Sequence, residues 1–391
     1  MQIIRVAFVL DHVQWQGGVN YFRNLLTAIQ ECPDINIQPV VVTGLNTSIN
    51  HFYGLAEIIR TPILDRYTML WWASKIFMKC FPFRNYPLYI FLSKHKVDLI
   101  SHSCVLWKNC KIPSVGWIPD FQHRYLPDFF DKNECYARDK QFLDIIKRCD
   151  AMILSSQDAL NDLNQFYSNN EIASHILRFV PSVSGNTKKT EESSQLSVRY
   201  NINQPWFYIP NQFWAHKNHL VVIEALRLAK AQGNNFLVVA TGSTNDSRNE
   251  NYFPSLVKKI EEYNLKDNFR ILGMIPFSDV IALMNDSIAV INPSLFEGWS
   301  TSVEESKALG KIIILSNITV HQEQAPDRGY FFDPMDPKML LNMMDKVFNL
   351  YNTDDEINHY EKAQSEYLNR RVIFAKKFES ICKKVLLESK I

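Results

Sequence analysis

The chain has 391 residues, of which 46% are hydrophobic and 21% are charged, so it is long enough for two or three domains with buried cores and too apolar for a disordered protein. Lysine and arginine together number 42 and aspartate and glutamate 41, and the formal net charge of +1 argues against a general nucleic-acid-binding protein. The seven scattered cysteines form no C-x-x-C pair, and the sequence has no apolar run of about 18 residues and no signal-peptide layout, so we expect a reduced, cytoplasmic protein.

The first half of the chain alternates short apolar strands with helical segments. Residues 3–12 predict a buried parallel strand, residues 15–29 a loop containing Gly17 and Gly18 that turns into a helix, and residues 35–44 a second strand. This order is typical of the opening of a doubly wound α/β domain. Further strands are predicted at 97–103, 113–119, 150–156 and 176–182.

The second half repeats this alternation after residues 184–200, a polar stretch without periodicity that predicts a linker. The first helix after the linker is predicted to end at Gly233, which suits the position that follows a helix C-cap. Strands are predicted at 206–211, 236–243, 269–275, 288–294 and 311–317.

The predicted fold class is therefore α/β, with two Rossmann-like domains that face each other across a cleft. We expect an N-terminal domain over residues 1–183, the linker, a C-terminal domain over residues 201–365 and a helix over residues 366–391 that packs back on one of the domains. The apolar residues of that last helix are spaced four, three and four apart, as on one helix face, at Phe374, Phe378, Ile381 and Val385.

The strongest local signal is a pair of glutamates in residues 292–316, which read NPSLFEGWSTSVEESKALGKIIILS. Glu297 follows a predicted strand, and Glu305 lies in the first turns of the next helix. Main-chain N–H groups at a helix start bind anions, and small side chains let a phosphate approach them. Two carboxylates at this place are suited to hold the hydroxyls that flank a phosphate. The small polar residues between the glutamates are Ser300, Thr301 and Ser302.

A helix cap is the alternative interpretation of the same segment. Thr301 with Glu304, or Ser302 with Glu305, fits the capping-box pattern S/T-x-x-E. A capping box does not explain Glu297 or the Glu-Gly turn, so spacing alone leaves both interpretations open.

A second signal lies in residues 208–226, YIPNQFWAHKNHLVVIEAL, where a strand ends, a loop follows and a helix begins near Asn218. Lys217 stands at this helix start, where a cation is unfavourable for the helix dipole. A lysine in such a place either has an anionic partner or is a solvated surface residue.

The segment around the two glutamates resembles the E-x7-E signature of family-4 glycosyltransferases of the GT-B fold, often written E-G-x-x-x-x-x-x-E-A-x-A-x-G. Ser306 replaces the usual alanine, and Pro293-Ser294 and residues 329–337, GYFFDPMDP, resemble the flanks. Residues 211–219, NQFWAHKNH, resemble a subset of these enzymes from bacterial surface-polysaccharide pathways. The residues that match the signature are Glu297, Gly298, Glu305, Ala308 and Gly310.

The resemblance implies a role for each of these groups. In that family the second glutamate contacts the ribose of the nucleotide and the first contacts the transferred sugar, which assigns Glu305 to the ribose and Glu297 to the sugar. Lys217 matches a lysine that binds the diphosphate, whereas the family's arginine five residues earlier is Gln212 here, an amide that carries no charge. The resemblance assigns the diphosphate also to the N–H groups around Ser300, Thr301 and Ser302.

Two motifs in the first half fit less closely. Gly17-Gly18 is either an ordinary glycine-containing turn or, by the resemblance, part of a loop that approaches the donor phosphates. The sequence has no G-x-G-x-x-G motif, which argues against a dinucleotide dehydrogenase. Asp120 and His123 follow a predicted strand and form either a polar loop with a structural histidine or, by the resemblance, groups near the sugar. The family's histidine before the aspartate is missing, because Pro119 occupies its position.

Residues 66–97 contain six basic residues, no acidic residue and many aromatic residues. This composition suits the membrane interface, and the alternative is a buried helix with exposed lysines.

We therefore expect a retaining glycosyltransferase that moves a hexose such as mannose from a GDP- or UDP-linked donor to a glycan or lipid-linked glycan in the synthesis of a cell-surface polysaccharide such as O-antigen or capsule. No D-x-D motif is present, so we expect no metal, and no cofactor besides the nucleotide-sugar substrate. We expect a cytoplasmic location, at the inner face of the membrane if residues 66–97 bind lipid. The alternatives are a nucleotide-sugar epimerase or hydrolase of the same fold and a non-catalytic nucleotide-sugar-binding scaffold.

Overall fold

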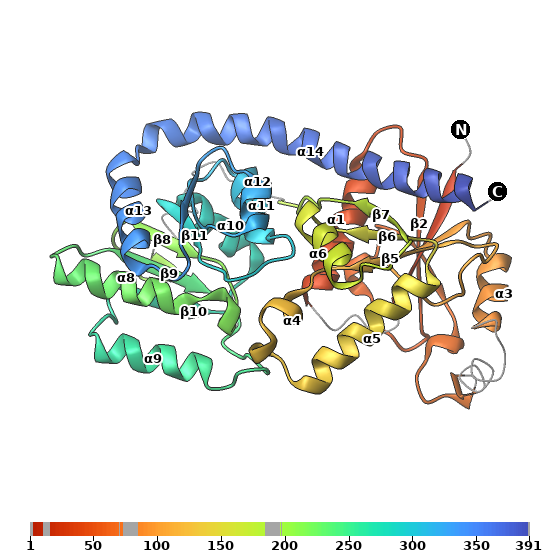
Figure 1. The fold of residues 1–391 in the computed structure, drawn as a ribbon. Helices are drawn as coiled ribbons and strands as arrows, with labels where there is room; N and C mark the ends of the chain where they lie inside the picture. Colours follow the sequence, from red (N-terminus) through yellow and green to blue (C-terminus); the bar gives the residue numbers. More distant parts are fainter. Residues whose placement is uncertain are drawn as a thin grey trace. The chain divides into compact units, whose positions relative to one another are not determined.

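Figure 1 shows a computed structural model of the chain, which describes residues 3–10, 16–69, 71–72, 85–183, 196 and 198–389. The chain divides into two units with separate sheets and cores. Unit 1 comprises Met1–Phe121, Asn133–Ser182 and Asn369–Ile391, and unit 2 comprises Gln122–Lys132 and Val183–Leu368. The predicted pair of parallel α/β domains is confirmed. In this division, residues 122–132 belong to unit 2 and residues 369–391 belong to unit 1.

Unit 1 is built on a seven-stranded sheet with the order β3-β2-β1-β4-β5-β6-β7, in which neighbouring strands are parallel. This order is that of a doubly wound fold, whose inner strands are buried on both faces and therefore read as nearly continuous apolar runs. The strands are β1 (Ile4–Val9), β2 (Ile37–Thr43), β3 (Glu57–Arg60), β4 (Leu99–Ser101), β5 (Ser114–Ile118), β6 (Ala151–Leu154) and β7 (Ala173–Ile176). The helical elements of this half of the chain are α1 (Gln16–Glu31), η1 (Asn50–Phe52), η2 (Pro62–Leu64), α3 (Tyr86–Lys94), α4 (Gln122–Tyr125), η3 (Pro127–Phe129), α5 (Lys132–Arg148) and α6 (Gln157–Phe166).

Unit 2 has a six-stranded parallel sheet with the order β10-β9-β8-β11-β12-β13. Helices α8, α9 and α13 pack together, as do α10, α11 and α12, which is the arrangement of a doubly wound sheet. The strands are β8 (Trp206–Ile209), β9 (Leu237–Thr241), β10 (Phe269–Gly273), β11 (Ala289–Asn292), β12 (Ile313–Ser316) and β13 (Gly329–Phe332). The helical elements are η4 (Ala215–Lys217), α8 (His219–Ala231), α9 (Tyr252–Glu262), α10 (Phe277–Asp286), α11 (Thr301–Ala308), α12 (Thr319–Gln324), α13 (Pro337–Leu350) and α14 (Thr353–Glu388).

Helix ends in unit 2 follow local signals in the sequence. Helix α8 ends at Ala231 and Gly233 adopts a φ of +84°, so the predicted C-terminal glycine is confirmed. The side chain of Asp336 caps α13, because it accepts hydrogen bonds from the amides of Lys338 at 2.8 Å and Met339 at 3.1 Å.

The second half of α14 packs on unit 1, as predicted for the C-terminal segment. Phe378 stacks on Phe8 of β1 with ring centroids 6.0 Å apart, and Nε of Arg371 donates to Oε2 of Glu31 at 3.0 Å. The predicted apolar face is buried at all four positions, Phe374, Phe378, Ile381 and Val385.

The first half of α14 is held in unit 2 by a buried ionic triad. Glu356 accepts from Nζ of Lys311 at 2.7 Å and from Nη2 of Arg328 at 2.6 Å, and Lys311 is only 3% exposed. Burial lowers the pKa of Lys311. Burial also favours the neutral form of Glu356, but the charges of Lys311 and Arg328 hold its pKa below the usual range. Gly310 makes room for the helix, since a Cβ there would lie 2.4 Å from the carbonyl oxygen of His359.

Replacing Glu356 with Gln is expected to lower the free energy of unfolding of unit 2 by about 3–5 kcal/mol, because Lys311 would keep a buried charge without its counter-ion. Equilibrium unfolding in urea measures this change. Glu366→Gln on the same helix is the matched control: its partner Lys362 lies 3.7 Å away at the surface, and the expected loss is below about 1 kcal/mol. Equal losses in the two variants would show that the buried triad does not stabilise unit 2.

Two predicted segments fall largely outside the described residues. Of the predicted linker, residues 184–195 and 197 lie outside, and so do residues 70 and 73–84 of the basic and aromatic stretch. In the described part of that stretch, Tyr67, Met69 and Trp72 are more than half exposed. Membrane contact through residues 66–97 stays a prediction, and no described helix is long and apolar enough to cross a membrane.

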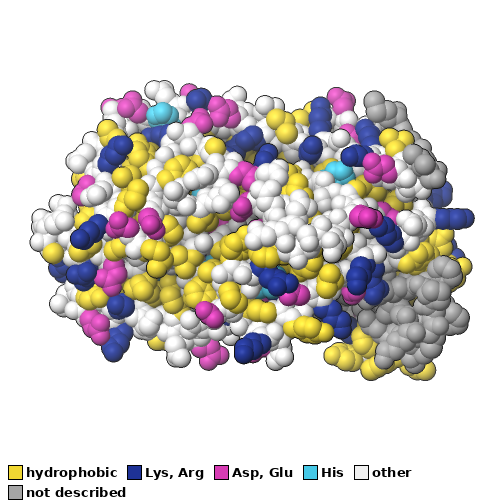
Figure 2. All heavy atoms as spheres, in the orientation of Figure 1, with side chains coloured by type: hydrophobic (Ala, Val, Ile, Leu, Met, Phe, Trp, Pro, Cys, Tyr) yellow, Lys and Arg dark blue, Asp and Glu magenta, His cyan; other side chains and the backbone are white. Residues whose placement is uncertain are grey.

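The described surface agrees with the balanced composition. On the face drawn in Figure 2, side chains of Lys and Arg are interspersed with those of Asp and Glu. The six described cysteines are free thiols.

Candidate active site

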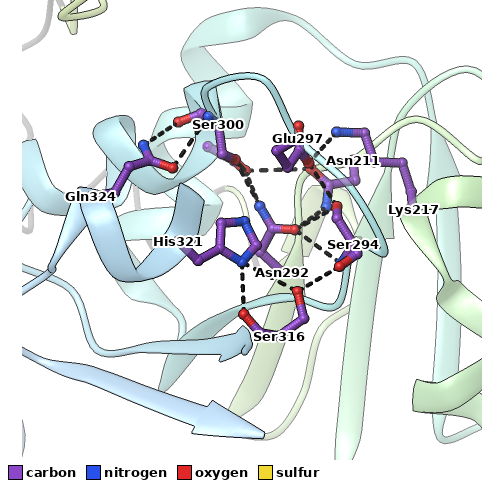
Figure 3. Close-up of polar contacts among 10 residues, drawn as sticks. Asn211, Lys217, Asn292, Ser294, Glu297, Ser300, Ser316, His321 and Gln324 are labelled. Atoms are coloured by element: carbon purple, nitrogen blue, oxygen red, sulfur yellow. Dashed lines mark hydrogen bonds and ion pairs between the residues drawn. The ribbon is translucent and has the colours of Figure 1, made fainter. Parts of the chain in front are cut away.

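The candidate site lies in unit 2, at the carboxyl ends of three neighbouring strands, β8, β11 and β12. The strand order reverses between β8 and β11, and ligands of open parallel sheets bind outside the strand ends at such a point. Polar side chains from the loops that follow these strands meet there (Figure 3). Both glutamates of the predicted pair come from the segment between β11 and β12.

Lys217 and Glu297 form an ion pair at this edge of the sheet. Nζ of Lys217 donates to Oε1 of Glu297 at 2.5 Å, and Oγ of Ser294 donates to the same oxygen at 2.6 Å. The main chain joins the two loops as well, because the amide of Leu295 donates to the carbonyl of His216 at 2.8 Å. The anionic partner expected for Lys217 is thus a protein carboxylate.

The charge of Lys217 sets the ionisation of Glu297. Burial favours the neutral form of this carboxyl, but the nearby ammonium holds its pKa below the usual value. Glu297 is therefore ionised at neutral pH while it is paired with Lys217.

Asn292, at the end of β11, joins the loops of the site. Its Oδ1 accepts from Oγ of Ser294 at 2.7 Å and from Nδ2 of Asn211 at 3.4 Å, and its Nδ2 donates to Oγ of Ser300 at 2.8 Å and to Oγ of Ser302 at 3.1 Å. Asn292 is fully buried, so its amide has to be satisfied by the protein. These hydrogen bonds fix the Glu297 loop relative to the start of α11.

His321 of α12 is a buried member of the network and contacts the end of β12. Its Nδ1 lies 2.9 Å from the carbonyl oxygen of Ser316, and the ring is fully buried. Burial lowers its pKa to about 4, so the imidazole is neutral at pH 7 and Nδ1 is the donor to that carbonyl.

The start of α11 differs in part from what the sequence predicts. Ser300 is the N-cap residue, its side chain makes no cap hydrogen bond, and neither predicted capping box forms. Its amide donates to Oε1 of Gln324 at 3.2 Å. Gln324 lies on α12, and its Nε2 also donates to the carbonyl of Ser300 at 3.0 Å. The roles predicted for Ser300, Thr301 and Ser302 stay predictions.

Glu305 is buried one turn further along α11. Among the described residues, none donates a hydrogen bond to its carboxylate, and burial raises its pKa to about 8. Such a carboxylate gains charge-assisted hydrogen bonds when a ligand brings hydroxyl groups to it.

Gln212 lies in the loop after β8, close to the loop after β9. Gly242 of the second loop adopts a φ of +141°, and a Cβ there would lie 2.5 Å from the carbonyl oxygen of Asn211 and 2.7 Å from Cα of Gln212. Glycine is therefore required for the two loops to touch.

Two further predicted residues are Asp120 and His123. Asp120 belongs to unit 1 and forms an ion pair with Arg138 at 3.6 Å. His123 is buried in α4, which belongs to unit 2, and its neighbour Tyr125 stacks on Phe296 with ring centroids 5.4 Å apart. Their roles near a sugar stay predictions.

Gly17 and Gly18 were expected in a loop, and this expectation is wrong, because they form the first turn of α1. Residues further along the helix, such as Val19 and Phe22, are buried against unit 1 and outweigh the low helix propensity of glycine. The predicted contact of the two glycines with donor phosphates stays a prediction.

Sequence reasoning missed the buried polar residues that hold the site together, Asn211, Asn292, His321 and Gln324. The available signal was a polar residue at the end of an apolar strand, as with Asn292 in IAVIN. No group of histidine, cysteine, aspartate or glutamate side chains suited to a metal occurs among the described residues.

Residues 196–364 match the family model described as glycosyl transferases group 1. This part of the chain is similar to that family. The matched residues contain β8 to β13 and the nine labelled residues of the network in Figure 3.

The chain is also similar to whole proteins. The O-antigen chain mannosyltransferase RfbU of Salmonella typhimurium is 24% identical over 354 residues, which cover 88% of this chain and 90% of that protein. A glycosyltransferase from Rickettsia africae has a TM-score of 0.70 at 17% identity, with 99% of each chain covered. HepE of Anabaena, solved with UDP and glucose, has a TM-score of 0.69 at 14% identity, with 97% of this chain and 100% of that chain covered. These matches indicate a glycosyltransferase and place the fold among GT-B glycosyltransferases.

Proposed function

We propose that the protein is a retaining glycosyltransferase that moves a hexose, mannose or a similar sugar, from a nucleotide diphosphate donor to a glycan or lipid-linked glycan during the synthesis of a cell-surface polysaccharide. The observation that carries this proposal is the placement of two carboxylates of different charge state at one sheet edge. Glu297 is ionised beside Lys217, whereas Glu305 is buried without a donor among the described residues.

Each of these groups has a task in the proposed reaction. Glu305 accepts hydrogen bonds from the ribose hydroxyls, and Glu297 accepts from the hydroxyls of the transferred sugar. Lys217 lies beside Glu297 and stabilises the negative charge that appears on the diphosphate as the glycosidic bond breaks. The buried network around Asn292 holds these groups in place before the donor binds.

The bond changes follow from retention of configuration. The acceptor oxygen bonds to the anomeric carbon on the face from which the diphosphate departs, the bond between that carbon and the phosphate oxygen breaks, and the acceptor proton passes to the departing phosphate. We place the synthesis of a lipopolysaccharide O-antigen first among the acceptor pathways, because the similar Salmonella protein is an O-antigen chain mannosyltransferase.

Thermal unfolding with a panel of nucleotides tests the proposal. GDP or UDP at 100 times its Kd should stabilise the protein by roughly 2.7 kcal/mol, and AMP should not. Incubation of the matching nucleotide sugar then separates the alternatives: turnover without any acceptor indicates an epimerase or hydrolase, and binding without turnover for any acceptor indicates a scaffold. No stabilisation by either nucleotide would contradict the proposal.

A further inference from the structure

Unit 1 contains a cavity that has no part in the proposed reaction. Its volume is about 540 Å³, within the roughly 300–1,000 Å³ that is usual for small-molecule sites. The residues that line it come from the segments that follow β1, β2 and β3, so it lies at the carboxyl ends of these strands. The strand order reverses between β1 and β4, and the cavity is therefore to one side of the switch point at which open parallel sheets bind their main ligand.

Two kinds of side chain line the cavity. The apolar ones are buried: Leu10, Val19, Ile49, Phe52 and Leu64. The polar ones include four exposed side chains that make no hydrogen bond or ion pair with any described residue: Asn46, Ser48, His51 and Arg66. The donors and acceptors of these four side chains are therefore available to a ligand.

The loop after β2 keeps its shape without the help of these four side chains. Nη1 of Arg60 donates to the carbonyls of Gly44 at 2.8 Å and Thr47 at 3.0 Å. The carboxylate of Asp65 accepts from the amide of Leu45 at 3.0 Å. A Cβ at Gly44 would lie 2.3 Å from Oδ1 of Asp65, so this contact requires glycine. The loop is thus ordered before a ligand binds, which lowers the entropic cost of binding.

An aromatic ring also lines the cavity. Tyr67 is 78% exposed, and its ring lies 5.6 Å from that of Trp71 between centroids. The φ of Tyr67 is +66°, a left-handed conformation that a bulky residue rarely adopts and that is concentrated at functional sites. An exposed ring beside unused hydroxyl, amide and guanidinium groups suits a sugar, because its C–H face packs on the ring and its hydroxyls both donate and accept hydrogen bonds.

We propose that this cavity binds a sugar residue of the acceptor glycan, one that does not itself react. The inference rests on the proposed function and deepens it, since it names residues that select the acceptor. Ser48 and Arg66 bind hydroxyls of the sugar, and Tyr67 covers its C–H face. A lipid chain in the same cavity would remove these polar groups from water without replacing their hydrogen bonds, so the glycan and not the lipid part of the acceptor is the occupant.

Saturation-transfer NMR of the full chain with the methyl glycosides of mannose, galactose, glucose and rhamnose tests the proposal. At least one glycoside is expected to bind the wild type. Ser48→Trp should raise its Kd about 10-fold or more, because the indole would occupy the cavity. Arg66→Ala should raise it about 10-fold, as for the loss of one charged hydrogen-bond donor. Both residues are exposed, so neither change should unfold unit 1.

Ser168→Trp is the matched control, because Ser168 is an exposed serine of unit 1 that does not line the cavity. It should bind the glycoside as the wild type does, and every variant should bind GDP or UDP normally, since the candidate donor site belongs to unit 2.

Three results would overturn the inference: the wild type binds none of the glycosides, Ser48→Trp binds as tightly as the Ser168→Trp control, or the matching nucleotide sugar glycosylates the bound glycoside in a reaction that Ser48→Trp abolishes. Failure of the wild type to bind any nucleoside diphosphate would instead contradict the proposed function.

Discussion

Replacing Lys217 with Ala is expected to lower the rate of sugar transfer about 100-fold or more, as is typical when a group that stabilises transition-state charge is removed. The variant also removes the counter-ion of Glu297. Burial then favours the neutral form of this carboxyl without the opposing charge of Lys217, so the pKa of Glu297 should rise. Steady-state kinetics with the donor identified in the nucleotide panel measure the first effect, and the pH dependence of the remaining activity reports the second.

Two further variants separate this role from a general loss of stability. Lys259→Ala removes the ammonium of another pair in unit 2, where Nζ lies 3.2 Å from Glu224, and should leave transfer unchanged. Lys217→Arg keeps a cation beside Glu297 and should remain folded, with activity between those of the wild type and the alanine variant. Near-normal turnover of a folded Lys217→Ala protein would show that the diphosphate does not depend on this ammonium.

Glu305→Gln is expected to weaken binding of the donor and, at the same time, to stabilise the fold. Loss of the charge-assisted hydrogen bonds to two ribose hydroxyls should raise the KM of the donor about 10- to 100-fold. The stability effect follows from the pKa of about 8 in the folded chain, which lies above the ordinary value of a glutamate.

The direction of the stability effect depends on pH. Between the ordinary pKa and about 8, the folded wild type holds a proton on Glu305 that the unfolded chain has released, so its stability falls as the pH rises through this window. Glutamine does not titrate, and the advantage of Glu305→Gln in free energy of unfolding should therefore grow from pH 5 to pH 8. Unfolding curves at several pH values give the measurement, and a constant difference would show that Glu305 does not titrate in this range. Glu304→Gln, one position earlier on α11, removes a carboxylate that is bound to Gln324 and Lys307 and should not show this gain.

The fold was predictable because its signals are local and repeated. Buried parallel strands appear as short apolar runs, and glycine or asparagine marks several helix ends, as at Gly233 and Asn218. The start of α1 was not predictable from Gly17 and Gly18, because tertiary burial decided it rather than helix propensity.

The site was predictable only in part, because sequence spacing does not report which side chains pair. Lys217 and Glu297 are 80 positions apart, and each was expected to meet a different part of the donor, yet they bind each other. The amide of Ser300 binds the side chain of a glutamine 24 positions later, and no pattern in the sequence indicates this contact. Partners of this kind are set by the packing of loops from neighbouring strands, which only the folded chain defines.

The assignment of residues 369–388 to unit 1 has a consequence for biosynthesis. The ribosome synthesises Phe8 before residues 183–368, but it synthesises the stacking partner Phe378 only after them. While unit 2 is translated and folds, the apolar residues of unit 1 that pack against residues 369–388 therefore stay uncovered. A nascent chain in this state is a natural client of chaperones, and truncations that stop before residue 369 are expected to aggregate rather than to yield a free N-terminal domain.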